Sequence, residues 1–178
     1  MNMKILITGP PRSGKSTLIL KLLGYFTQYN IPTSGFITPE VREYGKRIGF
    51  DIENISTKEK VKLAREGNFE TRFKLGKYSV FKEEFETFIE DLFALEKKKS
   101  DLIIIDEIGK MELFSIKFQD IIRELFSSNL MIIATIGLTL KHPIKSYLLK
   151  IPEIQLFNLT RQNFQLIFEK IISFISLN

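Results

Sequence analysis

Residues 9–16 read Gly-Pro-Pro-Arg-Ser-Gly-Lys-Ser and follow directly on a short apolar run, residues 3–8. Residues 17–28 come next, with hydrophobic side chains at helical spacing. The octet fits Gly-x-x-x-x-Gly-Lys-[Ser/Thr] at every fixed position, in the strand, loop and helix context that a phosphate-binding P-loop needs. A chance match in a chain of this length has a probability of about one per cent. The alternative, a tight turn that only joins a strand to a helix, is therefore weak.

The fixed positions of the octet have separate physical reasons. Gly9 and Gly14 are expected to take backbone angles with positive φ, which residues carrying a Cβ resist. The curled loop then points backbone N–H groups inward, and the following helix adds about half a positive charge at its N-terminus. Lys15 is expected to act in catalysis by reaching the β- and γ-phosphates of a nucleoside triphosphate, and Ser16 to bind Mg²⁺.

Length and composition favour one domain, residues 1–178, of a cytoplasmic protein. The chain has no cysteine, which excludes disulfides and thiolate metal sites and fits a reducing compartment. The apolar runs are strand-sized and the N-terminus lacks a signal-peptide pattern, so we expect no membrane partner. The net charge is +5, but the lysines are scattered and residues 97–99 are expected to be solvated at a helix end. Nucleic acid is thus not an expected partner, and a monomer is favoured although the oligomeric state stays open.

Strand-like and helix-like segments alternate along most of the chain. Strands are predicted at residues 4–8, 102–105, 130–136 and 153–158. Further helices are predicted at residues 81–95, 115–127 and 160–176, the last capped by Thr160. Residues 35–80 instead carry short β-branched and aromatic runs, interrupted near residues 43–46 and 54–58, which predict an antiparallel β meander that selects substrate or covers the site. The predicted class is α/β: a three-layer P-loop NTPase fold with a mostly parallel sheet and the meander inserted in it.

A second half of the site is predicted where Asp106 and Glu107 follow the apolar run at residues 102–105. The carboxyl ends of the strands are where open α/β sheets bind ligands. Asp106 is expected to hold Mg²⁺, through water, because this small cation keeps much of its hydration. Glu107 is expected to orient and deprotonate the attacking water. The alternative, that these acids only end a strand and cap the next element, is weaker for Asp106 than for Glu107.

Residues 106–109 also fit the Asp-x-x-Gly pattern of switch proteins, in which the N–H of the glycine, here Gly109, senses a γ-phosphate. The Asn-Lys-x-Asp tetrad of guanine-specific switches does not occur in the sequence, so base recognition is expected to be loose. The residues expected to contact the nucleotide are Gly9, Pro10, Pro11, Arg12, Ser13, Gly14, Lys15, Ser16, Thr17, Asp106, Glu107 and Gly109.

Over most of its length the chain resembles the small P-loop nucleoside-triphosphatases, the thermostable and vertebrate cancer-related type. The resemblance rests on residues 9–17, on residues 35–50, and on residues 102–113, which include Asp-Glu-Ile-Gly-Lys-Met-Glu-Leu. It implies Mg²⁺-dependent hydrolysis of several nucleoside triphosphates (ATP, GTP, CTP, UTP and TTP) to diphosphate and phosphate. Residues 160–163 look like the C-terminal motif of the family, although Phe164 stands where the family carries an arginine.

Three cations within these motifs are candidates for stabilising the transition state. A positioned arginine contributes about 10³ to 10⁵ in rate to phosphoryl transfer. We hypothesise that Arg42, Arg47 or Lys110 faces the γ-phosphate part of the time, which keeps hydrolysis slow; a solvated hairpin face is the alternative for each arginine.

Two functions other than hydrolysis stay open. In a small-molecule or nucleotide kinase the meander would bind the acceptor, and in a nucleotide-dependent switch or binding module slow hydrolysis would reset a conformation. The single histidine, His142, is expected to be a polar loop residue rather than a metal ligand. The sixteen phenylalanines are expected to pack in the core.

Overall fold

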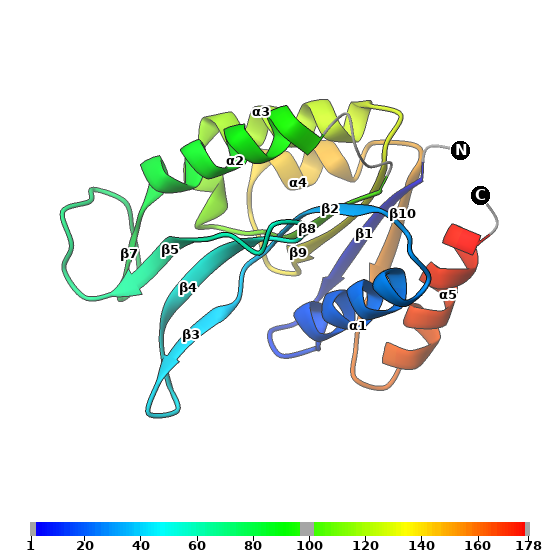
Figure 1. Cartoon of the computed structure of the whole chain (residues 1–178), viewed down its shortest axis with the longest axis horizontal. Coiled ribbons are helices and arrows are strands. Elements are labelled where there is room, and N and C mark those ends of the chain that lie inside the picture. Colours follow the sequence, from blue (N-terminus) through cyan, green and yellow to red (C-terminus); the bar gives the residue numbers. More distant parts are fainter. Residues whose placement is uncertain (1–2, 97–101, 177–178) are drawn as a thin grey trace.

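The structure, a computed structural model, describes residues 3–96 and 102–176. In this part of the chain ten strands form one sheet, in the order β10-β1-β9-β8-β2-β4-β5-β7-β6 with β3 paired to β4 (Figure 1). The parallel half contains β10 (Ile154–Asn158), β1 (Lys4–Gly9), β9 (Met131–Gly137), β8 (Leu102–Ile108) and β2 (Thr33–Ile37). The antiparallel half contains β4 (Lys46–Asn54), β3 (Glu40–Glu43), β5 (Lys60–Glu66), β7 (Tyr78–Val80) and β6 (Lys74–Leu75). The predicted α/β class is confirmed, and the meander continues the parallel sheet beyond β2. The meander was predicted to begin at residue 35, but residues 35–37 belong to β2, which pairs parallel with β8, so the inserted antiparallel strands begin with β3.

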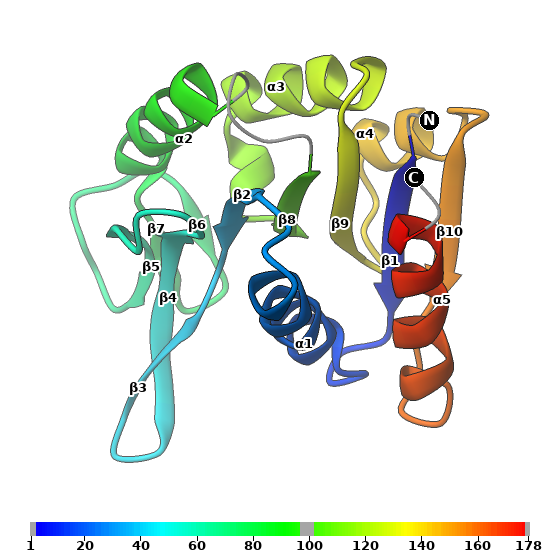
Figure 2. The same ribbon diagram turned by 45° about the vertical axis from the view of Figure 1, so that its right-hand side comes forward.

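Helices cover both faces of the parallel half, which makes three layers (Figure 2). One face carries α1 (Lys15–Gln28) and α5 (Phe164–Ser176); the other carries α2 (Lys82–Glu96), α3 (Ile116–Ser127) and α4 (Pro143–Leu148). The strand β8 shows why its sequence is uniformly aliphatic. Ile103 and Ile105 pack in the cluster under α2 and α3, whereas Leu102 and Ile104 pack in the cluster beneath α1. Both faces of the strand are therefore buried, so no polar residue alternates with the apolar ones.

The predicted interruptions of the meander are turns. Tyr44 and Gly45 join β3 to β4 with φ of 47° and 78°, and two successive positive φ values match the twist of a two-residue hairpin. The second interruption follows Asn54, whose Oδ1 accepts hydrogen bonds from the backbone N–H groups of Ser56 and Thr57 at 2.8 and 3.0 Å. Such a local bond lets asparagine close a turn with its own side chain.

Two predictions near the C-terminus need correction. The last helix begins at Phe164, not at Thr160. Thr160 and Asn163 instead close a turn, since each side-chain oxygen accepts from the other residue's backbone N–H. The helix α4 was not predicted. His142, which was expected to be a loop residue, is the N-cap of this helix, and its Nδ1 accepts from the N–H of Ile144 at 3.2 Å. The lysine run at residues 97–99, which was predicted to be solvated at a helix end, lies outside the described residues.

Phenylalanines contribute to the core between the sheet and the helices, as expected, although Phe69 is 45% exposed. Phe36 of β2, Phe85 of α2 and Phe118 of α3 are each at most 1% exposed, and their ring centroids lie 5.2 to 6.3 Å apart. These rings meet at tilted or edge-to-face angles, the geometry that aromatic pairs prefer. Among the described residues, no helix is both long enough and apolar enough to cross a bilayer.

Candidate active site

The P-loop lies between β1 and α1, at the carboxyl edge of the parallel strands. Gly14 has φ of 98°, as predicted, and stands directly before the first turn of α1. Gly9 does not have positive φ, which corrects the prediction. Glycine is needed at this position because any larger residue would clash: a Cβ there would lie 2.5 Å from the carbonyl oxygen of Leu159. The other positive φ in the loop, 64°, belongs to Arg12.

The first turn of α1 presents Lys15, Ser16 and Thr17 to the loop. Backbone N–H groups of a first helical turn have no partner within the helix, and they point toward its N-terminus, where anions bind. The Nζ of Lys15 lies 3.3 Å from the carbonyl oxygen of Gly9, so its ammonium group folds back over the loop. This end of the helix therefore combines unpaired amides with a positive side chain.

Asp106 ends the aliphatic part of β8 and is 2% exposed. The hydroxyl of Thr135, on the neighbouring strand β9, donates a hydrogen bond to Asp106 Oδ1, and Ser16 also hydrogen-bonds this carboxyl. Burial raises the pKa of Asp106, while these hydrogen bonds and the charge of Lys15 act in the opposite direction. The two sequence motifs, which lie some ninety residues apart, thus meet at one carboxyl group.

Thr135 was missed by the sequence analysis. It is the only hydroxyl side chain in the aliphatic run of β9, Met131–Gly137, and it is fully buried. A polar residue in a strand buried on both faces needs a hydrogen-bond partner. A single hydroxyl residue in an otherwise aliphatic strand was therefore the signal in the sequence. Its hydrogen-bond partner is Asp106, because β9 lies next to β8.

Glu107 follows Asp106 and is half-buried in the wall of the cleft. Burial raises the pKa of Glu107, the negative charge of Asp106 adds to the effect, and the charge of Lys15 opposes it. A carboxyl group with a raised pKa beside a phosphate site is suited to accept a proton.

A second carboxyl group, that of Glu112, stands next to Glu107. A Cβ placed on Gly109 would lie 2.8 Å from Glu107 Oε1 and 2.6 Å from Glu112 Oε2, so these oxygens are at most 5.4 Å apart, the sum of the two distances. Glu112 is 4% exposed, and burial, followed by the charge of Glu107, raises its pKa to about 8. Glu112 is thus neutral at pH 7. No role was predicted for Glu112, although it lies within the motif at residues 102–113, because nothing local in the sequence indicates its burial.

The backbone N–H of Gly109 hydrogen-bonds the carboxyl of Glu112. This N–H is the group that a switch protein would turn toward the γ-phosphate. In this structure Gly109 lines the cleft, but its N–H is engaged by a side chain of the same turn. The sensing role that the Asp-x-x-Gly pattern predicts for Gly109 stays a prediction, and it would require this N–H to leave the carboxyl of Glu112.

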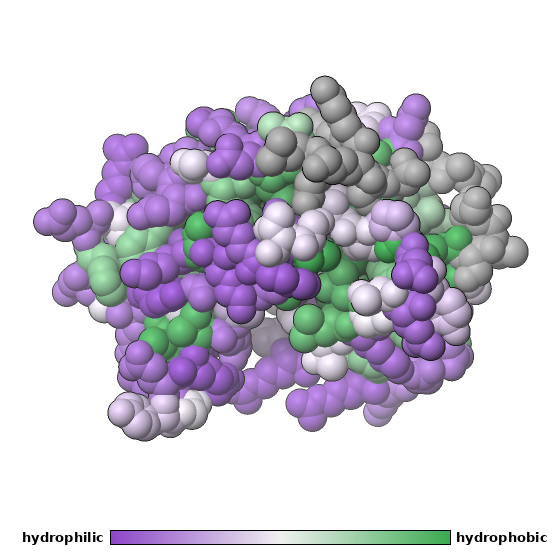
Figure 3. Space-filling model, viewed as in Figure 1, coloured by the Kyte–Doolittle hydropathy of each residue, from purple (hydrophilic) through white to green (hydrophobic). Residues whose placement is uncertain are grey.

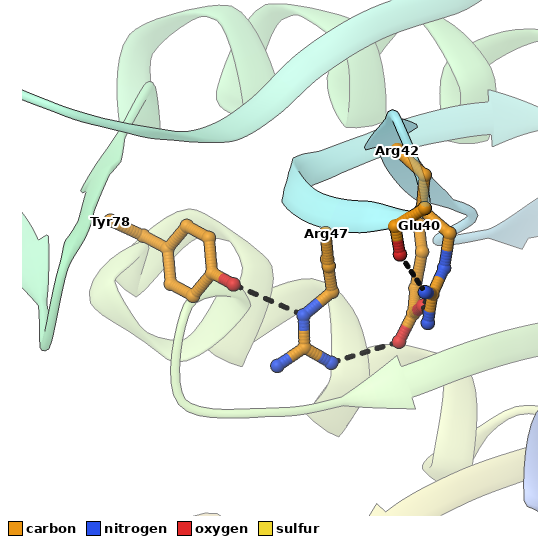
Figure 4. A network of polar contacts seen from close by, with 5 residues as sticks. Glu40, Arg42, Arg47 and Tyr78 are labelled. Atoms are coloured by element: carbon orange, nitrogen blue, oxygen red, sulfur yellow. Dashed lines mark hydrogen bonds and ion pairs between the residues drawn. The ribbon is translucent and has the colours of Figure 1, made fainter.

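The hairpin β3–β4 brings cations to the other side of the cleft (Figure 4). Glu40 pairs with Arg42 at 2.6 Å and with Arg47 at 2.8 Å, and Arg47 Nε also donates to the hydroxyl of Tyr78 at 3.0 Å. Hydrogen bonds from the arginines, that of Arg47 first, lower the pKa of Glu40. Lys110 lines the cleft and forms no ion pair with any described residue.

The cleft between these parts has a volume of about 1240 Å³. In the space-filling view the surface is hollowed between the β3–β4 hairpin and α1 (Figure 3). Of the residues predicted to contact nucleotide, those on its wall are Gly9, Pro11, Arg12, Gly14, Lys15, Ser16, Thr17, Glu107 and Gly109. Pro10, Ser13 and Asp106 do not line the cleft: Pro10 is exposed, whereas Ser13 and Asp106 are buried. The backbone N–H of Ser13 donates to the carbonyl oxygen of Pro10 at 3.1 Å. The volume is sufficient for a nucleoside triphosphate.

The C-terminal motif reaches the same place. Arg161 lines the cleft, and its Nε lies 3.4 Å from the carbonyl oxygen of Arg12. Phe164, at the position where an arginine was expected, has its ring edge 3.4 Å from where a Cβ on Gly14 would be. Phe164 therefore packs against the P-loop and contributes no charge to the phosphate site.

A sheet edge that joins a P-loop, a buried aspartate and a glutamate in one cleft defines a P-loop nucleotide-binding enzyme. Comparison with known families is more specific. The profile of the family described as NTPase matches residues 4–172, and the chain belongs to this family. It is accordingly an enzyme of the nucleoside-triphosphatase class.

Two curated relatives and two solved structures illustrate the similarity. The chain is 36% identical to nucleoside-triphosphatase THEP1 of Methanocaldococcus jannaschii over 96% of each chain. It is 34% identical to the mouse cancer-related nucleoside-triphosphatase homolog, over 92% of this chain and 91% of that one. The crystal structure of THEP1 from Aquifex aeolicus superimposes with a TM-score of 0.84, at 34% identity over 97% and 98% of the two chains. The solution structure of a human cancer-related nucleoside triphosphatase gives 0.81, at 31% identity over 97% of each.

Proposed function

We propose that this enzyme hydrolyses ATP, GTP, CTP, UTP and TTP to the diphosphate and phosphate, with Mg²⁺ and with little selectivity for the base. The observation that carries the proposal is the meeting of Lys15, Ser16 and Asp106 at one end of the cleft, with Glu107 beside them. The names of the relatives, nucleoside-triphosphatases, agree with hydrolysis in general.

The donor atoms at this end of the cleft fit Mg²⁺. The carboxylate of Asp106 and the hydroxyl of Ser16 are hard oxygen ligands within hydrogen-bonding distance of one another, and Mg²⁺ prefers such ligands while keeping several waters. Ser16 would bind the ion directly and Asp106 through water. The ion would neutralise charge on the β- and γ-phosphates.

The remaining roles fall to side chains of the chain itself. The amides of the P-loop and the ammonium group of Lys15 hold the β- and γ-phosphates. Glu107 orients a water molecule and takes one of its protons as the water oxygen attacks the γ-phosphorus. The bond from the γ-phosphorus to the bridging oxygen breaks, and the diphosphate leaves with the electron pair. Glu107 then returns the proton to solvent.

Phosphate release from the five triphosphates, with and without Mg²⁺, tests the proposal. We expect turnover with all five and none after removal of Mg²⁺. Lys15→Ala should weaken triphosphate binding by about tenfold to a hundredfold, because it removes hydrogen bonds to charged oxygens. Lys21→Ala, on the same helix but outside the cleft, is the matched control. Phosphate that appears only when a second small molecule accepts it would instead support the kinase.

The cation that stabilises the transition state has a separate test. Arg42 and Arg47 both form ion pairs with Glu40, whereas Lys110 forms no ion pair with a described residue. Lys110 is therefore the candidate that could reach the phosphate without breaking an ion pair. We expect Lys110→Ala to lower kcat about tenfold, less than the 10³ or more of a permanently placed cation. If the Lys110→Ala, Arg42→Ala and Arg47→Ala proteins each turned over as fast as the parent enzyme, all three cations would be excluded.

A further inference from the structure

The segment that follows β9 lies between the two motifs of the nucleotide site. In the sheet, β9 stands between β1, which leads into the P-loop, and β8, which carries the two adjacent carboxyl groups of the site (Figure 2). The last residue of β9, Gly137, pairs with Gly9 at the start of the P-loop. The chain after Gly137 therefore emerges at the carboxyl edge of the sheet, beside both motifs. The next three residues all line the nucleotide cleft: Leu138, Thr139 and Leu140.

Residues 137–140 form a turn that is held by two kinds of contact. The backbone N–H of Leu140 donates to the carbonyl oxygen of Gly137 at 3.2 Å, which closes the turn. The ammonium group of Lys145, in α4, donates to the same oxygen at 3.1 Å and also to the carbonyl oxygen of Leu138. Hydrogen bonds from a charged donor are about twice as strong as neutral ones. Lys145 thus fixes the turn by its carbonyl groups.

The contacts of Lys145 direct these carbonyl groups to a residue outside the cleft. Gly137 and Leu138 line the nucleotide cleft, whereas Lys145 does not. A carbonyl oxygen carries partial negative charge and would repel a phosphate group that it faced. Because the oxygens of Gly137 and Leu138 are bound by Lys145, the turn can stand beside a phosphate site without directing them at the phosphates.

The hydroxyl side chain that this turn brings to the cleft is that of Thr139. It is exposed, and its hydroxyl forms no hydrogen bond with a described residue. In contrast, the hydroxyls of Thr27, Thr71 and Thr87 each donate to a backbone carbonyl oxygen. The hydroxyl of Thr139 is therefore available as a donor, on the strand end that separates the P-loop from Glu107.

We propose that Thr139 donates a hydrogen bond to the γ-phosphate of a bound triphosphate and that Lys145 positions Thr139 by fixing the turn. The inference rests on the proposed function, in which the γ-phosphate lies between Lys15 and Glu107. A diphosphate lacks the group that Thr139 would bind. Thr139 should accordingly favour the substrate over the diphosphate product, which helps the product to leave.

The affinities for two nucleotides test the role of Thr139. The probes are ADP and an ATP analogue with nitrogen as the β–γ bridge, each titrated with Mg²⁺ into the full chain and followed by calorimetry. Thr139→Val removes the hydroxyl and keeps the shape of the side chain. It should weaken binding of the analogue about tenfold and leave that of ADP within about twofold of the parent. Thr139→Ser keeps a hydroxyl and should restore the affinity for the analogue.

Two results would overturn the role of Thr139. An equal loss of affinity for both nucleotides would show that Thr139→Val only disturbs the structure of the turn, and unchanged affinity for both would remove Thr139 from the site. Phosphate release by the parent is measured separately. If the parent releases no phosphate from any triphosphate, the proposed hydrolysis fails, whereas the ratio of the two affinities still reports on Thr139.

The positioning role of Lys145 has its own variants. Lys145→Met should lower the preference for the analogue over ADP about threefold to fivefold, because the turn loses its charged donor, and Lys145→Arg should keep that preference. Added to Thr139→Val, Lys145→Met should lower the preference no further, since both act through one hydroxyl. Lys150→Met, an exposed lysine beyond the end of α4, is the matched control. An unchanged preference in Lys145→Met, or an additive loss in the double variant, would refute the positioning role.

Discussion

Glu107→Gln is expected to lower kcat for triphosphate hydrolysis by about 10² to 10⁴, the range that a positioned general base contributes. Glutamine has nearly the same shape as glutamate but cannot accept the proton of the attacking water. The parent enzyme should gain turnover with rising pH as Glu107 loses its proton, at a pH above that of an ordinary glutamate because burial and Asp106 raise its pKa. This rise should be absent in the variant. Single-turnover phosphate release across a pH series measures both effects.

Nucleotide binding separates this role from a structural one. Because Lys15, Ser16 and Asp106 are unchanged in the Glu107→Gln protein, its affinity for a triphosphate analogue should stay within about threefold of the parent. Glu43→Gln, an exposed glutamate at the end of β3, is the matched control and should hydrolyse normally. Loss of binding together with turnover would make Glu107 a binding residue, and turnover within a factor of about three of the parent would remove it from the chemistry.

Sequence patterns predicted the parts of this molecule whose physical cause is local. The fixed residues of the P-loop, the four predicted strands and the hairpin turn at Tyr44 and Gly45 each follow from neighbours in the chain. The convergence of the P-loop and Asp106 could be predicted as well, because the carboxyl ends of parallel strands meet at one edge. The catalytic roles assigned to Lys15 and Glu107 remain predictions.

The parts that were missed depend on contacts between distant segments. Gly9 was assigned a positive φ, but its constraint is the carbonyl oxygen of Leu159, which is 150 residues away. Thr135 gains its role only when β9 lies beside β8. No local pattern in the sequence contains these distances.

Glu112 is the most consequential residue of this kind, and its ionisation should be visible in the stability of the fold. In the unfolded chain its pKa is the ordinary 4.5, whereas burial raises it to about 8 in the folded protein. The folded state therefore holds a proton that the unfolded state has lost throughout this interval, so this carboxyl makes the free energy of unfolding fall as the pH rises from 4.5 to about 8. Below 4.5 both states are protonated, and its contribution to stability is then complete.

Glu112→Gln replaces the carboxyl with a neutral amide whose oxygen can still accept from the N–H groups of Gly109 and residue 112. Relative to the parent, the variant should gain stability as the pH rises, by up to about 5 kcal/mol, at 1.36 kcal/mol for each pKa unit between 4.5 and about 8. Urea unfolding at a series of pH values, in EDTA and without nucleotide, measures this difference. Glu43→Gln should follow the parent at every pH. A stability difference between Glu112→Gln and the parent that does not change with pH would show that Glu112 ionises in the folded protein as it does in the unfolded chain.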